Sequence, residues 1–263
     1  MLEAIEEKIK NLNSKEEKVS LIREFLQIVV LKILRDKNTF LNIAFVGGTA
    51  LRILYGLKRY SEDLDFLLIK KEKYDFVILL ESLKKELELY NLQVDLKYKT
   101  GIVNSSFIKF KNVLQPFVLD VHRDEKLSVK LEIDTNPPKG AHLEEKIIND
   151  HFIFNLKAYD LSSLMAGKLH AVMYRKYSKG RDFYDLVWYL TKNIKPNVTL
   201  LNNAIIQTQK KDPEITEENW KKYLLNSLKA LDYMKIQKDV SPFLMDKSEA
   251  EIIQFSTFEK LLS

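Results

Sequence analysis

The stretch from residue 43 to residue 69 limits the possible folds more than any other part of this sequence. A short apolar run, Ile43 to Val46, ends in the pair Gly47-Gly48, and a helix-forming segment follows it. A second, mostly apolar run, from Leu64 to Ile69, then predicts another strand. A buried strand, a glycine turn, a short helix and a second strand together favour an α+β core over an all-helical fold.

Two carboxylates open the second of these strands. Asp63 and Asp65 lie two residues apart, so the strand period puts them on one face and Leu64 on the other. Close carboxylates repel unless a cation lies between them, and Mg²⁺ prefers oxygen ligands and also holds phosphates. Without further evidence, such a pair of Asp residues can also be explained as the solvent-exposed start of a strand.

The pair Gly47-Gly48 adds a second signal. Glycines let a ligand approach the backbone closely, and the first N–H groups of the helix that follows are free to bind an anion. Glycines alone also fit a plain strand-to-helix turn. A phosphate-binding turn followed by a pair of metal-binding carboxylates is the combination that a nucleoside triphosphate site needs.

A third carboxylate is expected on a neighbouring strand. Residues 127–134 alternate strictly, so that Lys130, Glu132 and Asp134 share the face opposite the apolar residues. We predict that Glu132 is the third acid, a metal ligand and general base. A solvent-facing side of an antiparallel strand explains this segment equally well. Asp120, also between apolar residues, is the second choice.

The rest of the chain divides into two parts. Helices are predicted at 16–36 and 73–89, and strands at 93–98, 104–111, 115–122 and 127–134. Beyond residue 156 the pattern is helical, with helices predicted at 160–176, 182–193, 197–210, 214–230 and 248–262. We therefore expect an α+β domain over residues 1–155 and a helical domain over 156–263.

Composition excludes several classes of site. The chain has no cysteine, which excludes disulfides, thiolate metal sites and cysteine nucleophiles. Its four histidines are scattered and lack metal-ligand spacing. The net charge of +5 is too small for a purely electrostatic nucleic-acid binder but allows a local basic patch. No signal peptide or membrane span is predicted, so we expect a cytoplasmic protein.

Two charged motifs occur in the helical part. Lys168 lies within an apolar stripe, which predicts that it points inward toward an anion such as phosphate, although a lysine can also snorkel to solvent. Arg181 and Asp185 lie one turn apart on the side away from the apolar face, as a surface ion pair would. Asp182 is the other candidate acid there.

These motifs, taken in order, resemble the DNA polymerase β-type nucleotidyltransferase fold. The finer resemblance is to the AbiEii/AbiGii toxin nucleotidyltransferases, and it covers roughly residues 43–190. It rests on a Gly-Gly-Thr turn, an Arg-x-Ser-x-Asp-Leu-Asp segment, a helical lysine and an Arg-Asp-x-x-Asp element. The matching residues are Gly47, Gly48, Thr49, Arg59, Ser61, Asp63, Asp65, Lys168, Arg181, Asp182 and Asp185.

The resemblance implies a polymerase β-type core with a mixed or antiparallel sheet, followed by helices that close over the cleft. The implied reaction moves a nucleoside monophosphate from an NTP to an acceptor hydroxyl and releases pyrophosphate. Two Mg²⁺ ions would be bound by Asp63 and Asp65, with Glu132 completing one site. Gly48, Thr49 and Arg59 would hold the triphosphate, and Lys168 would counter the charge on the phosphates. Asp185 would reach the nucleotide, held by Arg181.

The resemblance also implies a toxin with an antitoxin partner and an RNA acceptor such as tRNA. A small molecule, as in antibiotic modification, or a protein hydroxyl is the alternative acceptor. A binding module without catalysis is the third possibility, and the intact set of acids argues against it.

Overall fold

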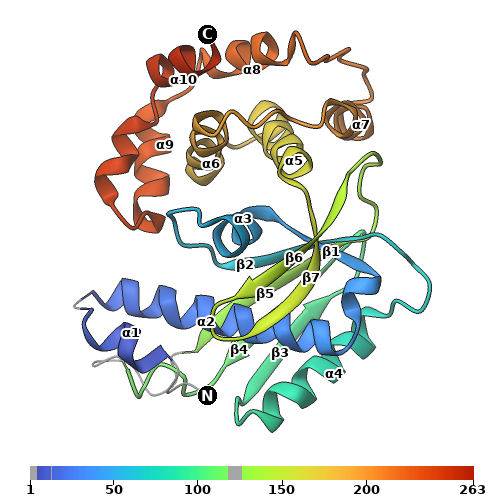
Figure 1. Ribbon diagram of the computed structural model, residues 1–263, viewed down its shortest axis with the longest axis vertical. Coiled ribbons are helices and arrows are strands. Elements are labelled where there is room, and N and C mark those ends of the chain that lie inside the picture. Colours follow the sequence, from blue (N-terminus) through green and yellow to red (C-terminus); the bar gives the residue numbers. More distant parts are fainter. Residues whose placement is uncertain (1–4, 13, 118–125) are drawn as a thin grey trace. The chain divides into compact units, whose positions relative to one another are not determined.

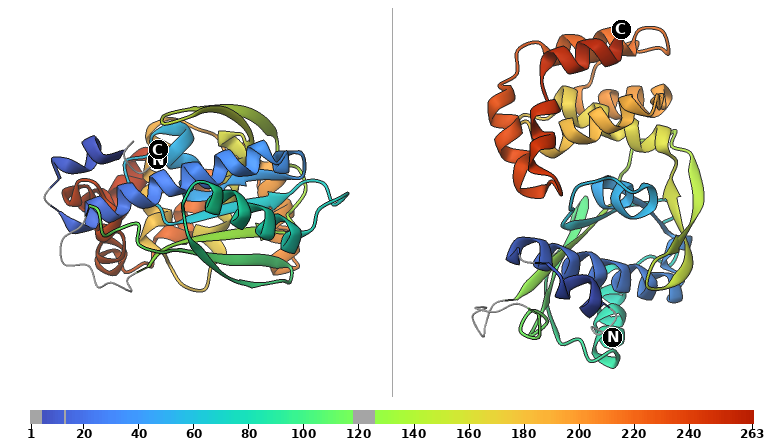
Figure 2. Two further views of the ribbon diagram at one scale, coloured as in Figure 1. Left: turned by 90° about the horizontal axis from the view of Figure 1, so that it is seen from below. Right: turned by 60° about the vertical axis from the view of Figure 1, so that its left-hand side comes forward.

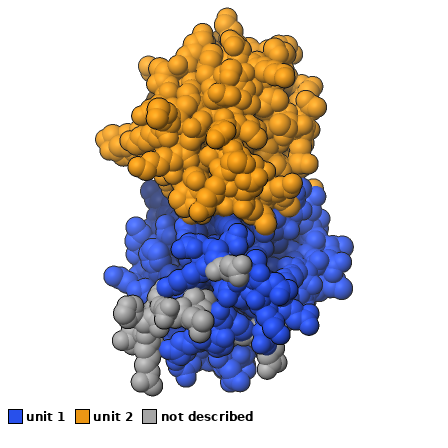
Figure 3. All heavy atoms as spheres, turned by 90° about the vertical axis from the view of Figure 1, so that its left-hand side faces the viewer, with its two compact units in different colours: residues 1–55, 60–136, 145–158 blue, residues 56–59, 137–144, 159–263 orange. Residues whose placement is uncertain are grey.

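The computed structural model describes residues 5–12, 14–117 and 126–263. By contacts the chain forms two compact units, coloured separately in Figure 3. Unit 1 comprises residues 1–55, 60–136 and 145–158, and unit 2 comprises residues 56–59, 137–144 and 159–263. The predicted division into a domain over residues 1–155 and a helical domain over residues 156–263 stays a prediction.

A seven-stranded sheet forms the centre of unit 1, in the order β3-β4-β5-β2-β1-β7-β6. β2 runs parallel to β5 and antiparallel to β1, and β4 runs antiparallel to both β3 and β5. The sheet is therefore mixed, as expected. The strands are β1 (Ile43–Val46), β2 (Asp63–Leu68), β3 (Val94–Lys99), β4 (Val103–Phe110), β5 (Leu127–Asp134), β6 (Leu143–Asn149) and β7 (Ile153–Tyr159).

The helices fall into two groups. In unit 1 they are α1 (Glu6–Lys10), α2 (Lys15–Asp36), the short 3-10 turn η2 (Thr39–Leu41), α3 (Gly47–Tyr55) and α4 (Phe76–Leu89). In unit 2 they are α5 (Leu161–Tyr174), α6 (Gly180–Thr191), α7 (Val198–Gln209), α8 (Trp220–Leu228), α9 (Tyr233–Val240), η3 (Ser241–Phe243), η4 (Lys247–Ile252) and α10 (Phe255–Leu262).

One face of the sheet in unit 1 carries the hydrophobic core. β5 alternates strictly between buried and half-buried residues, so Leu131 and Ile133 point to the same side as Leu64 and Phe66 of β2. α2, α3 and α4 contribute apolar side chains to this cluster, and Figure 1 shows α2 lying across the strands. The opposite face is left to the polar residues of the same strands.

Unit 2 is built from helices packed on one another (Figure 2). The Asp160 side chain caps α5 by accepting a hydrogen bond from the Ser163 N–H. α6 begins at Gly180, where an added Cβ would lie 2.3 Å from the Ile236 carbonyl oxygen of α9. Only glycine permits this approach, so the residue fixes how closely α6 and α9 pack.

Several predicted elements need correction. The predicted helix at 214–230 begins only at Trp220, because Asp212 accepts a hydrogen bond from the Glu214 N–H in a turn instead of capping a helix. Residues 115–117 lie outside any strand, and the rest of the predicted strand at 115–122 lies outside the described residues. β6 and β7 were not predicted. In the ranges that the structure describes, no helix is both long and apolar enough to cross a membrane.

Replacing Leu131 with alanine should destabilise unit 1. Leu131 is 0% exposed in the middle of β5, so the change leaves a cavity between the sheet and the helices and should lower the free energy of unfolding by about 2–5 kcal/mol. The measurement is urea unfolding followed by circular dichroism. Ile153→Ala, at a side chain 76% exposed, is the control and should change the free energy by less than about 1 kcal/mol. Equal losses in the two variants would contradict this placement of the core.

Candidate active site

The pairing of β2 with β5 brings the predicted acids together in unit 1. In the parallel register Asp65 lies beside Glu132, and Asp63 lies beside Lys130. Partners in register point to the same side of a sheet, so these side chains share the face away from the core. All four residues are half-buried. The predicted grouping of Asp63, Asp65 and Glu132 on one face is thus present.

Gly47 lies against one of these acids. Its φ is +81°, and a Cβ built on it would lie 2.4 Å from the Asp65 Oδ2 atom. Any other residue would therefore be strained and would also collide with the carboxylate. α3 begins at Gly47, and its first turn contains no acidic residue. The N-terminus of α3 thus places partial positive charge near Asp65.

Thr49 and Ser61 hold the chain that leads into β2. The Thr49 hydroxyl, almost fully buried, donates to the Asp63 carbonyl oxygen and lies 2.8 Å from the Ser61 Oγ. From α2, the Gln27 side chain donates to the Ser61 carbonyl oxygen at 3.1 Å. These contacts tie α3 and α2 to the start of β2. Both side chains therefore fix the position of Asp63, a role that the sequence pattern did not indicate.

Lys130 is the basic residue of this group. Its Nζ lies 2.8 Å from the Glu132 Oε2 and 5.9 Å from the centre of the Phe107 ring. Burial opposes its charge, but Glu132, Asp63 and Asp65 outweigh burial and raise the pKa of Lys130 above its usual value. The lysine therefore stays protonated and partly neutralises the carboxylates.

The acids of this group offer oxygen atoms, the donors that a hard divalent cation prefers. Within the ranges that the structure covers, no three His, Asp or Glu side chains are gathered closely enough to hold a metal ion as a set. Glu132 is instead paired with Lys130. The available donors are carboxylate oxygens, which Mg²⁺ prefers, so the chemistry of the donors agrees with the predicted metal. That Asp63, Asp65 and Glu132 hold Mg²⁺ stays a prediction.

A second group of charges is buried in unit 2. The Arg59 Nε and Nη2 donate to the two oxygens of Asp185 at 2.6 and 2.7 Å. The exposed fractions of the two side chains are 2% and 0%. A backbone bridge between Arg59 and Leu244 holds the arginine in this unit. Such a bidentate contact matches the guanidinium to the carboxylate and fixes both groups.

Lys168 joins this ion cluster. Its Nζ lies 2.7 Å from Asp182 Oδ1 and 2.8 Å from Asp185 Oδ2. Arg175 also contacts Asp182. Burial opposes the charge of Asp185, but Arg59 and Lys168 outweigh it and lower the pKa of Asp185 below its usual value. Likewise burial works against the charge of Lys168, but Asp182 and Asp185 raise its pKa.

The structure corrects the predicted surroundings of Asp185. The sequence placed it on the outer side of its helix with Arg181, as a surface pair would be. Asp185 is instead fully buried, because the polar side of α6 is covered by other parts of unit 2 that supply Arg59 and Lys168. The Arg181 guanidinium lies 4.2 Å from the centre of the Phe243 ring. Lys168 does point inward, as predicted.

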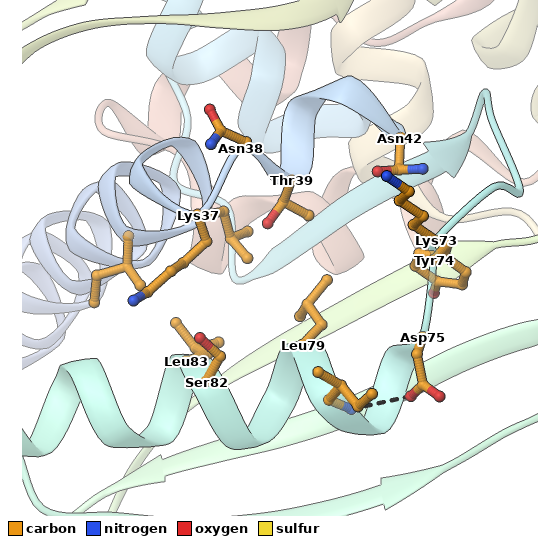
Figure 4. A pocket seen from close by; sticks show the side chains of 13 residues that line it. Lys37, Asn38, Thr39, Asn42, Lys73, Tyr74, Asp75, Leu79, Ser82 and Leu83 are labelled. Carbon is orange, nitrogen blue, oxygen red and sulfur yellow. Dashed lines mark hydrogen bonds between the residues drawn. The ribbon is translucent and has the colours of Figure 1, made fainter.

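A surface pocket of about 260 Å³ lies elsewhere in unit 1, between the end of α2 and the start of α4 (Figure 4). Lys37, Asn42 and Tyr74 are among its lining residues, and Asp75 caps α4 at its border. It is separate from the predicted site residues. Asp120, the rival third acid, lies outside the described residues.

Replacing Gly47 with alanine should destabilise unit 1. The strained φ and the contact with Asp65 should together lower the free energy of unfolding by about 1–3 kcal/mol. Gly167→Ala is the matched control: its position inside α5 is open, so alanine should raise the free energy of unfolding by about 0.5–1 kcal/mol. Urea unfolding of both variants measures the difference. A Gly47→Ala protein as stable as the native one would refute the close packing.

Replacing Asp185 with asparagine should destabilise unit 2 in a pH-dependent way. At pH 7 the variant lacks the negative charge that pairs with Arg59 and Lys168. Its free energy of unfolding should therefore be lower by about 3–5 kcal/mol. The native pKa is lowered from the usual 3.8, so the stabilisation is present above pH 3.8 and disappears as the pH falls through the lower folded value. The difference in the free energy of unfolding between the native and the variant protein should therefore become smaller below pH 3.8.

The measurement is urea unfolding at pH 7 and at pH 3. Asp150→Asn is the control, since Asp150 pairs with Lys8 at the exposed surface and should change the free energy by less than about 1 kcal/mol. A gap for Asp185→Asn that stays constant across this pH range would contradict the buried ion cluster.

Comparisons with known proteins identify the family and the fold. The family profile described as nucleotidyl transferase AbiEii toxin, type IV TA system, matches residues 30–262. The solved structure of JHP933 from Helicobacter pylori is 21% identical, with a TM-score of 0.53, and the match covers 92% of this chain and 91% of that one. A candidate nucleotidyltransferase from H. pylori is also 21% identical, with a TM-score of 0.57 and coverages of 92% and 94%. No curated protein matches the sequence.

The two solved structures share the fold, and the family profile spans most of the chain, including both groups of charged residues. The protein is therefore a nucleotidyltransferase that belongs to the AbiEii toxin family of type IV toxin–antitoxin systems.

Proposed function

We propose that the protein transfers a nucleoside monophosphate from an NTP to a hydroxyl of an RNA acceptor, with tRNA as the expected acceptor, in a reaction that depends on Mg²⁺. The observation that carries this proposal is the arrangement at β2 and β5. Asp63, Asp65 and Glu132 share one face, and the Gly47-Gly48 start of α3 lies next to Asp65. A negatively charged triphosphate and the cations that accompany it need both features together.

The acids have distinct roles in the proposed reaction. Asp63 and Asp65 would bind the Mg²⁺ ions, with Glu132 as the third ligand. Bound Mg²⁺ would neutralise the phosphate oxygens and lower the pKa of the attacking hydroxyl. The acceptor oxygen forms a bond to the α-phosphorus, its proton passes to Glu132, and the bond to pyrophosphate breaks.

The backbone at Gly47 and Gly48 is proposed to cradle the triphosphate, while Thr49 and Ser61 position the start of β2. Lys168 and Arg59 belong to unit 2, and their predicted contact with the phosphates stays a prediction. Their ion pairs with Asp185 hold them in fixed orientations, so in this proposal Asp185 acts by positioning. Arg59 precedes Asp63 by four residues, so a short piece of chain joins the two groups. Arg181 is retained as a candidate nucleotide contact.

The family description supports two partners. A toxin of a type IV system implies a cognate antitoxin, and a nucleotidyltransferase implies an NTP substrate. The alternative acceptor is a hydroxyl of a small molecule or of a protein, and the experiment below separates it from RNA.

Incubation with α-³²P-labelled NTPs, Mg²⁺ and total RNA should place label in RNA. Asp65→Asn should reduce the incorporation at least about a hundredfold, because the variant loses a charge that the site needs for the metal and the phosphates. EDTA should abolish incorporation. Label is followed separately in RNA, protein and small-molecule fractions.

Asp75→Asn serves as the matched control for this experiment. Asp75 caps α4, and asparagine caps a helix equally well, so incorporation should be unchanged. Label that appears only in protein or small molecules would exclude RNA as the acceptor. Label in RNA from the Asp65→Asn protein at the native rate would exclude the proposed site.

A further inference from the structure

The face of the sheet that carries the acids continues into a basic surface. β3, β4 and β5 pair in an unbroken antiparallel register, in which Lys97 lies opposite Phe107, and Phe107 lies opposite Lys130. Lys99 and Lys109 have the same parity and share this side. We call the surface formed by Lys97, Lys99, Phe107, Lys109 and Lys130 the lysine face.

Much of the lysine face is exposed to solvent. Lys97 and Lys99 are exposed, Lys109 is half-buried, and the Phe107 side chain is 42% exposed. α2, α3 and α4 contribute to the core on the opposite side of the same strands. An exposed aromatic ring among lysines contrasts with the apolar residues that point the other way from β4 and β5, such as Ile108 and Leu131.

Positive charge also extends past the strand ends. Lys111 and Lys126 both contact Asp95 of β3, at 2.6 and 2.7 Å. Hydrogen bonds from Lys111 and then Lys126 lower the pKa of Asp95 to about 2, so it is ionised at neutral pH. One carboxylate against two ammonium groups leaves this end of the face positive as well.

We infer that the lysine face binds an unpaired stretch of the RNA acceptor, with a base stacked on Phe107 and backbone phosphates on Lys97, Lys99 and Lys109. Lysines interleaved with an exposed aromatic ring form the standard chemistry for single strands, whose bases are free to stack. A base pair inside a duplex offers no such face to a side chain. The inference rests on the proposed function, since it names how the acceptor of that same site is held.

Geometry connects this surface to the acids. Phe107 pairs with Lys130, and Glu132 lies two residues further along β5. Strands are about 4.8 Å apart and rise about 3.3 Å per residue, which puts the Cα atoms of Phe107 and Glu132 roughly 8 Å apart. A base stacked on Phe107 therefore brings a neighbouring ribose of the strand within reach of Glu132, which would accept the proton of the attacking hydroxyl.

Binding of a fluorescein-labelled single-stranded RNA decamer, measured by anisotropy without NTP or divalent ions, tests the inference directly. Phe107→Ala should weaken binding about 5- to 100-fold without changing the salt dependence. The triple variant Lys97→Gln, Lys99→Gln, Lys109→Gln should weaken binding and lower the slope of log Kd against log salt by about 2, since each phosphate contact on a single strand contributes about 0.7.

The matched control is the triple variant Lys70→Gln, Lys71→Gln, Lys85→Gln, which removes the same charge from exposed lysines elsewhere in unit 1. It should bind RNA as the native protein does, and thermal melts should show that all variants are folded. Native-like binding by the lysine-face variants, equal affinity for a blunt RNA duplex, or equal competition by polyglutamate would overturn the inference.

The assay also separates this inference from the proposed function. One outcome is that RNA binding depends on Phe107 but no label is transferred to RNA. This would exclude the proposed reaction and still support the lysine face as an RNA-binding surface. Transfer of label to RNA by lysine-face variants at the native rate and native KM would exclude the surface and leave the reaction intact.

Discussion

The parallel register of β2 with β5 is the constraint on which the site depends. It places Asp65 beside Glu132 and, through the strand period, sends Leu64 and Leu131 into the core on the other side. A slip of one residue would bury the acids and expose the leucines, so the hydrophobic core fixes the positions of the acids. Gly47 adds a second restraint, because only a residue without a side chain fits against the Asp65 carboxylate.

Both groups of charged residues follow the same electrostatic rule. Cations lie beside the carboxylates in both: Lys130 in unit 1, and Arg59 and Lys168 in unit 2. The group in unit 1 is half-buried, whereas the pair of Arg59 and Asp185 is almost fully buried. Burial therefore suggests different tasks, with binding at the first group and the fixing of side-chain orientation at the second.

The sequence predicted the elements whose patterns are local. Alternation in residues 127–134 gave β5 with its observed bounds, and the run at 43–46 gave β1. β6 was missed because it alternates with mostly exposed positions and lacks a strong apolar face. The partners of Asp185 were missed for a different reason: Arg59 lies 126 residues away in the chain, and a helical period says nothing of such distant contacts. Likewise, the position of Lys130 beside Glu132 was visible in the sequence, but not the rise in the pKa of Lys130 that the carboxylates cause.

The overall charge of the chain conceals how that charge is arranged. A net charge of +5 is the difference between 42 basic and 37 acidic residues, and on its own it argues against a purely electrostatic nucleic-acid binder. Strand alternation, however, sorts residues by parity, so that Lys97, Phe107 and Lys109 lie on the same side of the sheet as the acids. An acidic centre then borders a basic surface while the total nearly cancels. Affinity for a phosphate backbone depends on this local field, which extends only about 8 Å at physiological salt, and not on the sum over the chain.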